Sequence, residues 1–521
     1  MNSTIPRKFA AVAGLVAGGL AVAVGMFVAA VTEVVSPIDA VGSEVIDRAP
    51  LWLKEQAIEW FGTDDKLALR IGIISILAVA AVGVGLLAAR RLWWGIAGIA
   101  LFGVVGSLAA GHRPGESASA AVPSILGAAG GALVLYRLVQ PRSVEGDADP
   151  TATPGWDRRR FLVAGGATAA GAVVAGGMAR GIEERRVDQI RESIQRPLPA
   201  IVAPPEAQES PPGAELLDPP NDIPPDAELF DETPYITPND EFYRIDTALT
   251  FPNVNIDSWS FEINGMVDKP TKFTYADLLA LPQVERTVTL CCVSNEVGGD
   301  LIGNAVFRGV MLRDLLETAG VQPAAEQVFS TSLDGWTCGF PVEVAVDGRD
   351  AMVAIGMNGE TLPLEHGYPA RLVVPGLYGY VSATKWLAEI KLTSWDEEGY
   401  WVPRGWAALG PVKTQSRIDV PRSRKVKAGK QAIAGVAWAQ HRGVEQVEVQ
   451  IDDGDWQPAT LAADVSIDTW RQWLLEWEPT PGKYTLRVRA TDQTGETQTE
   501  LETPVAPNGA TGYHTIRVTV E

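Results

Sequence analysis

Long apolar runs, separated by short charged segments, dominate the first third of the chain. Each run approaches the length of about 20 residues that a helix needs to cross a bilayer. Five such runs occur, at residues 9–31, 67–89, 92–110, 120–139 and 161–178. The pattern therefore predicts a membrane region of about five transmembrane helices at the start of the chain.

Basic residues indicate the orientation of these helices. Cations precede the first run, separate the second from the third and follow the fourth, whereas the connection at 33–66 is acidic overall. Under the positive-inside rule the N-terminus then lies in the cytoplasm, and everything after residue 181 lies outside it. The cations are Arg7, Lys8, Arg90, Arg91, Arg137 and Arg142. We therefore expect a multi-pass protein of the cell membrane with an extracytoplasmic soluble part.

Few residues inside the apolar runs could carry chemistry. His112 is the one histidine of this region, so it offers no paired axial haem ligands, and no Asp or Glu falls inside the runs. Glycines recur at spacings that let helices pack closely, for example Gly95 with Gly98 and Gly103 with Gly106. The region is expected to be a packed anchor in the lipid bilayer, with a quinone or partner-protein site as the open alternative.

The fifth run follows Arg158-Arg159-Arg160-Phe161-Leu162 and is weakly apolar, rich in alanine and glycine. This order resembles an internal twin-arginine export signal, a receptor-read address for proteins that are exported already folded. An ordinary anchor preceded by arginines is the alternative. No clear cleavage site follows, so residues 158–182 are expected to remain as a fifth transmembrane helix after a four-helix membrane region at 1–157.

A spacer follows the membrane region. Residues 183–234 are first charged and then rich in proline pairs, such as Pro204-Pro205 and Pro211-Pro212. Paired prolines favour an extended polyproline conformation and leave no hydrophobic periodicity. This segment is therefore expected to be a semi-rigid linker.

The soluble part shows two patterns. Residues 235–412 combine short alternating strands with short helices, expected at 275–281 and 312–319, the second closed by Gly320. This indicates a mixed α+β domain. Residues 413–521 alternate apolar and polar positions with glycine turns throughout, which is typical of a two-sheet, immunoglobulin-like sandwich.

Composition narrows the chemistry. The formal net charge is −21, with 64 acidic against 43 basic residues, which disfavours binding to nucleic-acid phosphates. Motifs for dinucleotide, phosphate-loop or zinc-protease chemistry are absent.

Cys291 and Cys292 stand side by side after a β-branched run at 287–290 that predicts a strand. Thiolates are soft metal ligands, and buried inert thiols are the alternative. Strand alternation puts the two side chains on opposite faces, so only one can bind a metal.

Several stretches of the soluble half carry a resemblance to a known family. Residues 288–295 read Val-Thr-Leu-Cys-Cys-Val-Ser-Asn, and residues 307–316 read Phe-Arg-Gly-Val-Met-Leu-Arg-Asp-Leu-Leu. Residues 366–376 read His-Gly-Tyr-Pro-Ala-Arg-Leu-Val-Val-Pro-Gly, with Lys385-Trp386 beyond them. From about residue 233 onward the chain resembles the sulfite oxidase family of molybdopterin oxidoreductases.

The family implies a fold for each part of the soluble half. Residues 235–412 would form the α+β molybdopterin-binding domain of the sulfite oxidase fold. Residues 413–521 would form the immunoglobulin-like domain, which often makes dimers in the family. The expected fold is therefore a transmembrane helical region, an α+β cofactor domain and an all-β sandwich.

The resemblance also implies roles for individual residues. Cys292 matches the thiolate that binds molybdenum, and it forms the implied catalytic set with Arg244 and Tyr380. Cations such as Arg371 and Lys385 suit the phosphate of the pterin. The carboxylate of Asp334 can accept hydrogen bonds from the amino groups of the pterin. The implied cofactor contacts are Tyr243, Arg244, Asn295, Asp334, His366, Arg371, Thr384 and Lys385.

This sequence also departs from the family. The histidine of the family's opening motif is missing, and Ile245-Asp246 stands there instead. Sulfite oxidases usually continue after the cysteine with Gly-Asn-Arg-Arg, whereas residues 294–297 read Ser-Asn-Glu-Val. Two cations are thus replaced and one carboxylate is added, so a dianion such as sulfite would be held less well. The alternative for Asp334 and Arg371 is that they are partners in structural salt bridges. The alternative for His366 is that it is a structural histidine in a turn, with its hydrogen bonds satisfied there.

The resemblance implies a molybdenum-cofactor enzyme that moves an oxygen atom and two electrons to or from a small, sulfur-containing substrate. An S-oxide reductase of the methionine-sulfoxide type is one alternative, and a non-catalytic cell-surface interaction protein is another. No haem or iron–sulfur cysteine set is found, so electrons would leave through a redox protein, a quinone or a small carrier. A homodimer through the last domain and a disulfide at Cys291 or Cys338 stay open.

Overall fold

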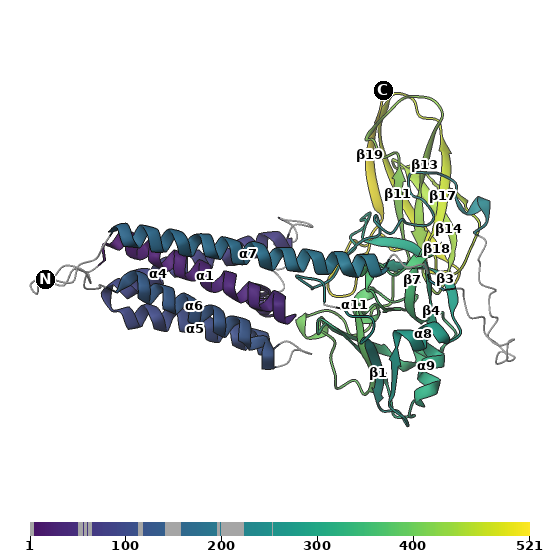
Figure 1. The fold of residues 1–521 in the computed structure, drawn as a ribbon. Coiled ribbons are helices and arrows are strands. Elements are labelled where there is room, and N and C mark those ends of the chain that lie inside the picture. The colour runs from purple at the N-terminus through teal and green to yellow at the C-terminus, as the bar shows by residue number, and fades with distance from the viewer. Residues whose placement is uncertain are drawn as a thin grey trace, which may run out of the picture. The chain divides into compact units, whose positions relative to one another are not determined.

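The computed structural model describes residues 5–50, 56, 60, 65–112, 118–140, 158–194, 198–199, 223–252 and 254–521. The chain divides into two compact units (Figure 1). The first comprises Met1–Gln189 and Thr247–Asn253, and the second comprises Ile190–Asp246 and Val254–Glu521. Arg142 and the pairs Pro204-Pro205 and Pro211-Pro212 lie outside the described residues.

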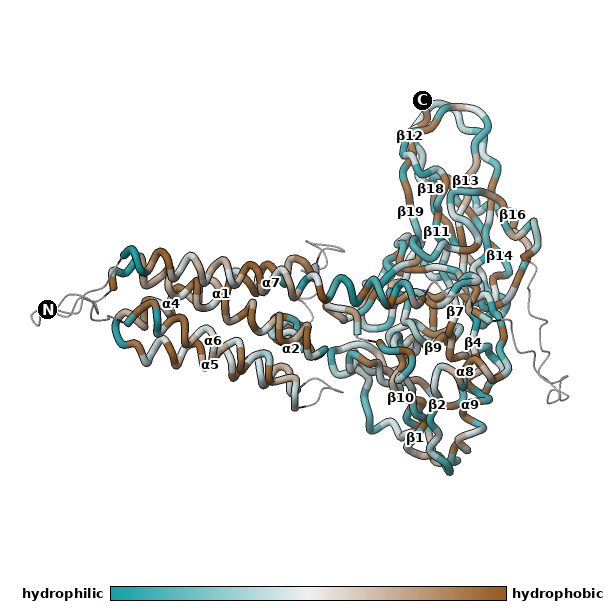
Figure 2. Tube along the Cα trace, viewed as in Figure 1, coloured by the Kyte–Doolittle hydropathy of each residue, from teal (hydrophilic) through white to brown (hydrophobic). Residues whose placement is uncertain are grey.

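The first unit is a bundle of helices whose residues are largely hydrophobic (Figure 2). Among the described residues, five helices are long and apolar enough to cross a membrane, which confirms the five long apolar helices expected from the apolar runs. The α-helices of the first unit are α1 (Arg7–Thr32), α2 (Pro37–Arg48), α4 (Asp65–Arg90), α5 (Leu92–Gly111), α6 (Val122–Val139) and α7 (Arg158–Ile194).

Glycines allow these helices to approach closely, as their spacing predicted. A Cβ atom added at Gly95 of α5 would lie 2.4 Å from the Cβ of Ala88 on α4, and one at Gly103 would lie 2.6 Å from the Cβ of Ala128 on α6. A larger side chain at either position would therefore push neighbouring helices apart.

Two features of the first unit were not predicted. Helix α2 occupies part of the acidic connection, and the hydroxyl of Ser36 caps it by accepting a 3.2 Å hydrogen bond from the amide of Asp39. Arg70 of α4 then donates to Asp39 (2.9 Å) and to the carbonyl of Leu249 (2.9 Å). In addition, α7 continues to Ile194, beyond the expected end at 182.

The α+β part of the second unit contains two five-stranded sheets. The first has the order β2-β1-β10-β5-β6, and the second has the order β3-β4-β7-β8 with β9 paired to β7. The first sheet consists of β1 (Ser260–Gly265), β2 (Thr271–Thr274), β5 (Gln327–Ser332), β6 (Thr337–Pro341) and β10 (Leu387–Thr393). The second consists of β3 (Val284–Cys291), β4 (Ile302–Met311), β7 (Met352–Met357), β8 (Glu360–Thr361) and β9 (Arg371–Val373).

Short helices connect these strands. The two expected helices are confirmed as α8 (Tyr275–Ala280) and α9 (Leu312–Ala319), and Gly320 ends the second with a φ of 70°. That left-handed conformation favours glycine because it has no Cβ. The others are α10 (Val342–Val346) and α11 (Gly379–Ser382).

The last hundred residues form the expected two-sheet sandwich. One sheet has the order β11-β13-β17-β16 and the other has the order β12-β19-β18-β14-β15. Alternate positions such as Ile433, Val447, Trp473 and Val488 are fully buried between the sheets. The strands are β11 (Gln415–Val420), β12 (Lys425–Val426), β13 (Gln431–Trp438), β14 (Val444–Ile451), β15 (Trp456–Pro458), β16 (Thr460–Leu461), β17 (Arg471–Trp477), β18 (Gly482–Asp492) and β19 (His514–Val520).

The sandwich is hydrogen-bonded directly to strand β3 through Thr289. The amide of Thr289 donates to the carbonyl of Asp468 (3.0 Å), and its hydroxyl accepts from the amide of Trp470 (2.7 Å). The side chain of Gln440 donates to the Thr289 carbonyl (3.1 Å). The strand that leads to the paired cysteines is therefore fixed by the sandwich as well as by its own sheet.

Candidate active site

The paired cysteines lie at the end of β3, inside the second unit. Cys291 is 2% exposed and Cys292 is 8% exposed. The Cys292 sulfur accepts a hydrogen bond from the amide of Ser294 (3.4 Å), while the Cys291 sulfur lies 3.5 Å from the Cys292 carbonyl oxygen. Burial raises the pKa of the Cys292 thiol, and the Ser294 hydrogen bonds and the charge of Lys385 oppose that rise. All three cysteines are free thiols, so a disulfide receives no support.

The side-chain amide of Asn295, in the turn after Cys292, is only partly hydrogen-bonded. The Oδ1 atom of Asn295 accepts from the amide of Leu301 (2.9 Å). Among the described residues, its buried Nδ2 atom has no hydrogen-bond partner of ordinary geometry, although it lies close enough to Cys291 to oppose the rise of that thiol's pKa. A buried donor without a partner costs free energy, so Nδ2 is well suited to an acceptor on a ligand.

Three cations gather in the same part of the domain, and we call Arg244, Arg371 and Lys385 the cation pocket. Arg371, at the start of β9, is 5% exposed and donates to the carbonyls of His366 (3.1 Å) and Leu372 (3.3 Å). Within the described part of the chain its guanidinium forms no salt bridge. Burial lowers the pKa of Arg371 to about 10.

Lys385 is the second buried cation of the pocket. Its ammonium donates to Asp246 (2.9 Å) and to the carbonyl of Glu365 (3.1 Å). Burial lowers the pKa of Lys385 to about 8, Asp246 raises it, and the charges of Arg371 and Arg244 lower it further. Arg371 and Arg244 therefore lie near enough to Lys385 to destabilise its positive charge.

The pocket is richer in positive than in negative groups. Asp246 also accepts from the Nε atom of Arg244 (2.9 Å), so this one carboxylate serves two of the three cations. The carboxylate of Glu365 is engaged by Arg191 at 2.8 Å. Buried charge without a counter-ion is costly, so this arrangement is best completed by an anionic ligand.

His366 closes the short helix η4 (Leu364–His366) next to this pocket. Burial lowers its pKa to about 4, so the imidazole is neutral near pH 7. Its Nε2 atom lies 2.8 Å from the carbonyl oxygen of Asn239, which requires the proton on Nε2. The Nδ1 atom is then an acceptor. Asn239 was not among the predicted site residues, since a backbone contact leaves no sequence signal.

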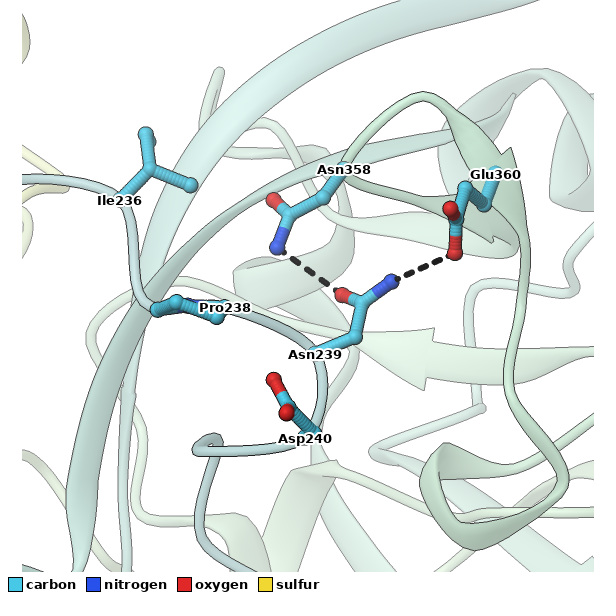
Figure 3. A pocket seen from close by; sticks show the side chains of 6 residues that line it. All are labelled: Ile236, Pro238, Asn239, Asp240, Asn358 and Glu360. Atoms are coloured by element: carbon cyan, nitrogen blue, oxygen red, sulfur yellow. Dashed lines mark hydrogen bonds between the residues drawn. The ribbon is translucent and has the colours of Figure 1, made fainter.

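Asn239 also lines a cavity of about 500 Å³ (Figure 3). Asn358 donates to the Oδ1 atom of Asn239 (2.9 Å), and Asn239 donates to Glu360 (3.3 Å). The predicted site residues do not line this cavity, so it is distinct from the cation pocket. Its lining residues are Ile236, Pro238, Asn239, Asp240, Asn358 and Glu360.

Tyrosines lie close to the thiols. The ring of Tyr243 stacks on Phe242 at 5.2 Å, and burial, followed by the nearby Cys292, raises its pKa well above the ordinary value. Tyr378 is 3% exposed, and burial together with Cys291 raises its pKa as well. By contrast, the Tyr380 hydroxyl donates to the carbonyl of Ala407 (2.7 Å). The structure thus places Tyr378, which was not predicted, near the thiols and turns the hydroxyl of Tyr380 toward the segment after β10.

Asp334 and Thr384 lie on the flanks of the site. Asp334 occupies the turn between β5 and β6, where its carboxylate accepts from the amide of Trp336 (3.2 Å). The adjacent amide of Leu333 donates to the carbonyl of Trp386 (2.8 Å), which brings this turn to the Lys385 segment. The Thr384 hydroxyl contacts Ser330 (2.7 Å) and Cys338 (3.1 Å).

The donor set fits a molybdopterin cofactor. A thiol at a strand end offers a soft ligand, the cation pocket offers charge for a phosphate, and the unpartnered amide of Asn295 offers a directed donor. The structure brings Cys292, Tyr243, Arg371 and Lys385 into one neighbourhood, although they lie far apart in sequence.

Comparisons with known proteins agree with this chemistry. A family model described as the oxidoreductase molybdopterin binding domain matches residues 248–401. The uncharacterized oxidoreductase YuiH of Bacillus subtilis is 34% identical over 152 residues, which cover 29% of this chain and 74% of that protein. The sulfite oxidase of Arabidopsis thaliana is 30% identical over 258 residues, covering 40% of this chain and 65% of the plant protein.

Two further proteins are similar to this chain. Human mitochondrial sulfite oxidase is 29% identical over 307 residues, which cover 49% of this chain. The chain thus spans 65% of the length of the plant enzyme and 56% of that of the human enzyme. The sulfane dehydrogenase SoxCD of Paracoccus pantotrophus has 26% sequence identity and a TM-score of 0.49, with 57% of this chain and 83% of that chain covered.

Proposed function

The chain belongs to the sulfite oxidase family of molybdenum-cofactor oxidoreductases, and we propose that it is a membrane-anchored member acting outside the cytoplasm. Its reaction would be a two-electron oxygen-atom transfer on a small, sulfur-containing substrate. The observation that carries the proposal is a buried thiol beside a cation pocket that lacks enough negative charge of its own.

The residues of the pocket divide the work of holding the cofactor. Cys292 would ligate the metal through its sulfur, while Arg371 and Lys385 would bind the phosphate. His366, Asn295 and Asp334 would offer hydrogen bonds to the pterin, with Tyr243, Arg244 and Thr384 beside them. When bound, the cofactor supplies a redox-active molybdenum that can exchange an oxygen atom and two electrons with a substrate.

The protein's own contribution is electrostatic and steric. Cys292 must lose its proton to become a ligand, and burial opposes this loss, whereas Lys385 and the Ser294 amide favour the thiolate. Tyr243 and Tyr378 exclude water near the sulfur. Neutral His366 adds no charge to a pocket that already holds three cations.

Metal analysis tests the proposal most directly. The purified full-length chain should contain molybdenum in stoichiometric amount, and Cys292→Ser should lose it. Cys291→Ala is the matched control, because the neighbouring thiol is buried but is not the proposed ligand; it should keep the metal. Absence of molybdenum from the wild-type protein, or its retention in Cys292→Ser, would contradict the proposal and favour a non-catalytic interaction protein.

The second part of the proposal concerns the substrate and the direction of the oxygen-atom transfer. Glu296 adds negative charge where the family resemblance implies a cation, which disfavours a dianion such as sulfite and favours a neutral S-oxide. A panel of sulfite and S-oxides, measured with oxidising and reducing dyes, separates the two directions. Oxidation of sulfite at a higher kcat/KM than any S-oxide reduction would reject the reductase alternative.

Location and electron transfer follow from the first unit. Five helices able to cross a membrane, with cations at alternate ends, support an extracytoplasmic catalytic domain, and residues 158–162 support export by the twin-arginine route. Electrons would pass to a redox protein, a quinone or a small carrier. Protease protection of the soluble part in spheroplasts, but not in inverted vesicles, would contradict this topology.

A further inference from the structure

Asp246 has no role in the predicted site, yet it makes two hydrogen bonds inside it. Its side chain is 5% exposed, and its Oδ2 atom accepts from the Nε atom of Arg244 and from the Nζ atom of Lys385, each at 2.9 Å. The lysine lies 139 residues away in sequence. Asp246 therefore joins the opening segment of the domain to the segment before β10.

Lys385 needs this carboxylate because its surroundings otherwise oppose its charge. The side chain is 10% exposed and lies near two arginines of the cation pocket. Burial lowers the pKa of Lys385 most, while the charge and the hydrogen bond of Asp246 raise it. Without Asp246, the one acceptor left to the ammonium among the described residues would be the Glu365 carbonyl, and the lysine would either lose its proton or move toward water.

The geometry also leaves one donor of Lys385 for a ligand. An ammonium has three N–H donors, and within the described residues two of them are bonded, to Asp246 and to the Glu365 carbonyl. Two fixed acceptors set the direction of the third donor. The cation pocket with Asp246 carries a formal charge of about +2, which complements a phosphate monoester near its second ionisation.

We propose that Asp246 is a positioning residue: it holds Lys385 in place so that the pocket is assembled before an anionic, phosphate-bearing cofactor arrives. The inference rests on the proposed function, because it assigns the phosphate to Lys385. Asp246 acts through the lysine and does not itself touch the cofactor. Its substitution should therefore matter only while Lys385 is present.

A double-mutant cycle tests this dependence. The full-length wild type, Asp246→Asn, Lys385→Met and the double variant are purified, and cofactor loss is followed as metal content and as fluorescence of the released pterin during dialysis. Asp246→Asn should release the cofactor roughly thirtyfold faster or more, as truncation of a buried charge pair usually does. The double variant should release it no faster than Lys385→Met alone.

Three further measurements make the outcome decisive. Asp246→Glu should restore most of the retention, because it keeps the charge. Asp257→Asn, an exposed site on the same segment, should behave as wild type. Thermal unfolding should show that Asp246→Asn is folded; if that variant is unfolded, the comparison is made between Asp246→Glu and Asp246→Glu with Lys385→Met.

Two results would overturn the inference. Either the effects of Asp246→Asn and Lys385→Met add fully in the cycle, or Asp246→Asn retains the cofactor as wild type does. In both cases the wild type still holds molybdenum, so the proposed function stands. A wild type without molybdenum would instead reject the proposed function itself.

Discussion

Two groups of cations in the second unit differ in how their charge is balanced. In the sandwich, Arg442 donates to Asp492 (2.9 Å), and Arg417 donates to Asp419 (2.6 Å), so each cation has its own carboxylate. In the cation pocket, Arg371 donates to backbone carbonyls, and one carboxylate serves the other two cations. Balanced pairs indicate a structural role, whereas unbalanced ones indicate a site for an anion.

The pKa values reflect the same difference. Burial alone would raise the pKa of Asp492, yet hydrogen bonds from Thr494, Thr414 and Arg442 lower it to about 2, so its charged form is stabilised in the fold. Burial lowers the pKa of Arg371 to about 10, so its charged form is destabilised. Before a ligand binds, the first group favours the folded state and the second opposes it.

The largest effect is expected for a substitution in the cation pocket, where the positive charges outnumber the carboxylates. Arg371→Met should abolish retention of molybdenum, because the charge for the phosphate is gone, while the melting temperature of the cofactor-free protein should stay the same or rise. Replacing an uncompensated buried charge with an apolar side chain is often neutral or stabilising. Metal analysis and thermal melts of the full chain in detergent check both parts. A large loss of cofactor-free stability would mean that Arg371 is a structural residue.

A substitution in the Arg442–Asp492 pair of the sandwich should lower stability and leave molybdenum binding intact. Arg442→Met removes the cation from Asp492, whose side chain is wholly buried but keeps its hydrogen bonds from Thr414 and Thr494, so a loss of about 1–3 kcal/mol is expected. The melting temperature should fall clearly, and whatever protein stays folded should still bind molybdenum. Equal losses of metal and of stability would remove the distinction between the two groups.

The pH dependence of stability sharpens the comparison. The pKa of Lys385 is about 8 in the fold against 10.5 for the free side chain, so the unfolded chain binds more protons between these values. Stability of the cofactor-free protein should therefore rise with pH from about 8 to 10.5, and a penalty on the order of 3 kcal/mol is fully present below pH 8. Chemical denaturation at several pH values measures the slope.

Lys385→Met is the control for that slope. The variant lacks the titrating group, so its stability should change less with pH across the same window than that of the wild type. Identical slopes in the two proteins would show that Lys385 is not destabilised by its surroundings.

The smallest effect is expected at an exposed pair. Lys430 lies 2.8 Å from Glu476, but the two side chains are 75% and 71% exposed. Water screens such a pair, so Lys430→Ala should leave both the melting temperature and the molybdenum content unchanged. A measurable loss in either would show that exposure is a poor guide to the importance of charge pairs in this protein.

Local patterns predicted the elements of the fold but not the contacts between distant segments. The apolar runs and the alternation of the last hundred residues each report a local periodicity, and both were confirmed. Helix α2 was missed because its apolar stripe is short and interrupted by charges. The end of α7 was missed because its last turns are polar, so hydropathy gives no sign that the helix continues.

The candidate site shows the same limit. Motifs pointed to Cys292, Arg371 and Lys385, and the structure places them near one another. Asp246 looked like a mere departure from the family, because its meaning depends on a lysine 139 residues away. Asn239 contributes a backbone carbonyl, for which any residue type would serve. The roles of the predicted site residues remain predictions until the variants are measured.

The hydrogen bonds at Thr289 have a consequence for how such proteins can evolve. The strand that ends in the paired cysteines takes three of its hydrogen bonds from the sandwich, through Asp468, Trp470 and Gln440. A recombination event that exchanged the sandwich for another domain would leave those groups without partners. The border near residue 413 therefore separates two sequence patterns but not two interchangeable modules, and the two parts should be inherited together.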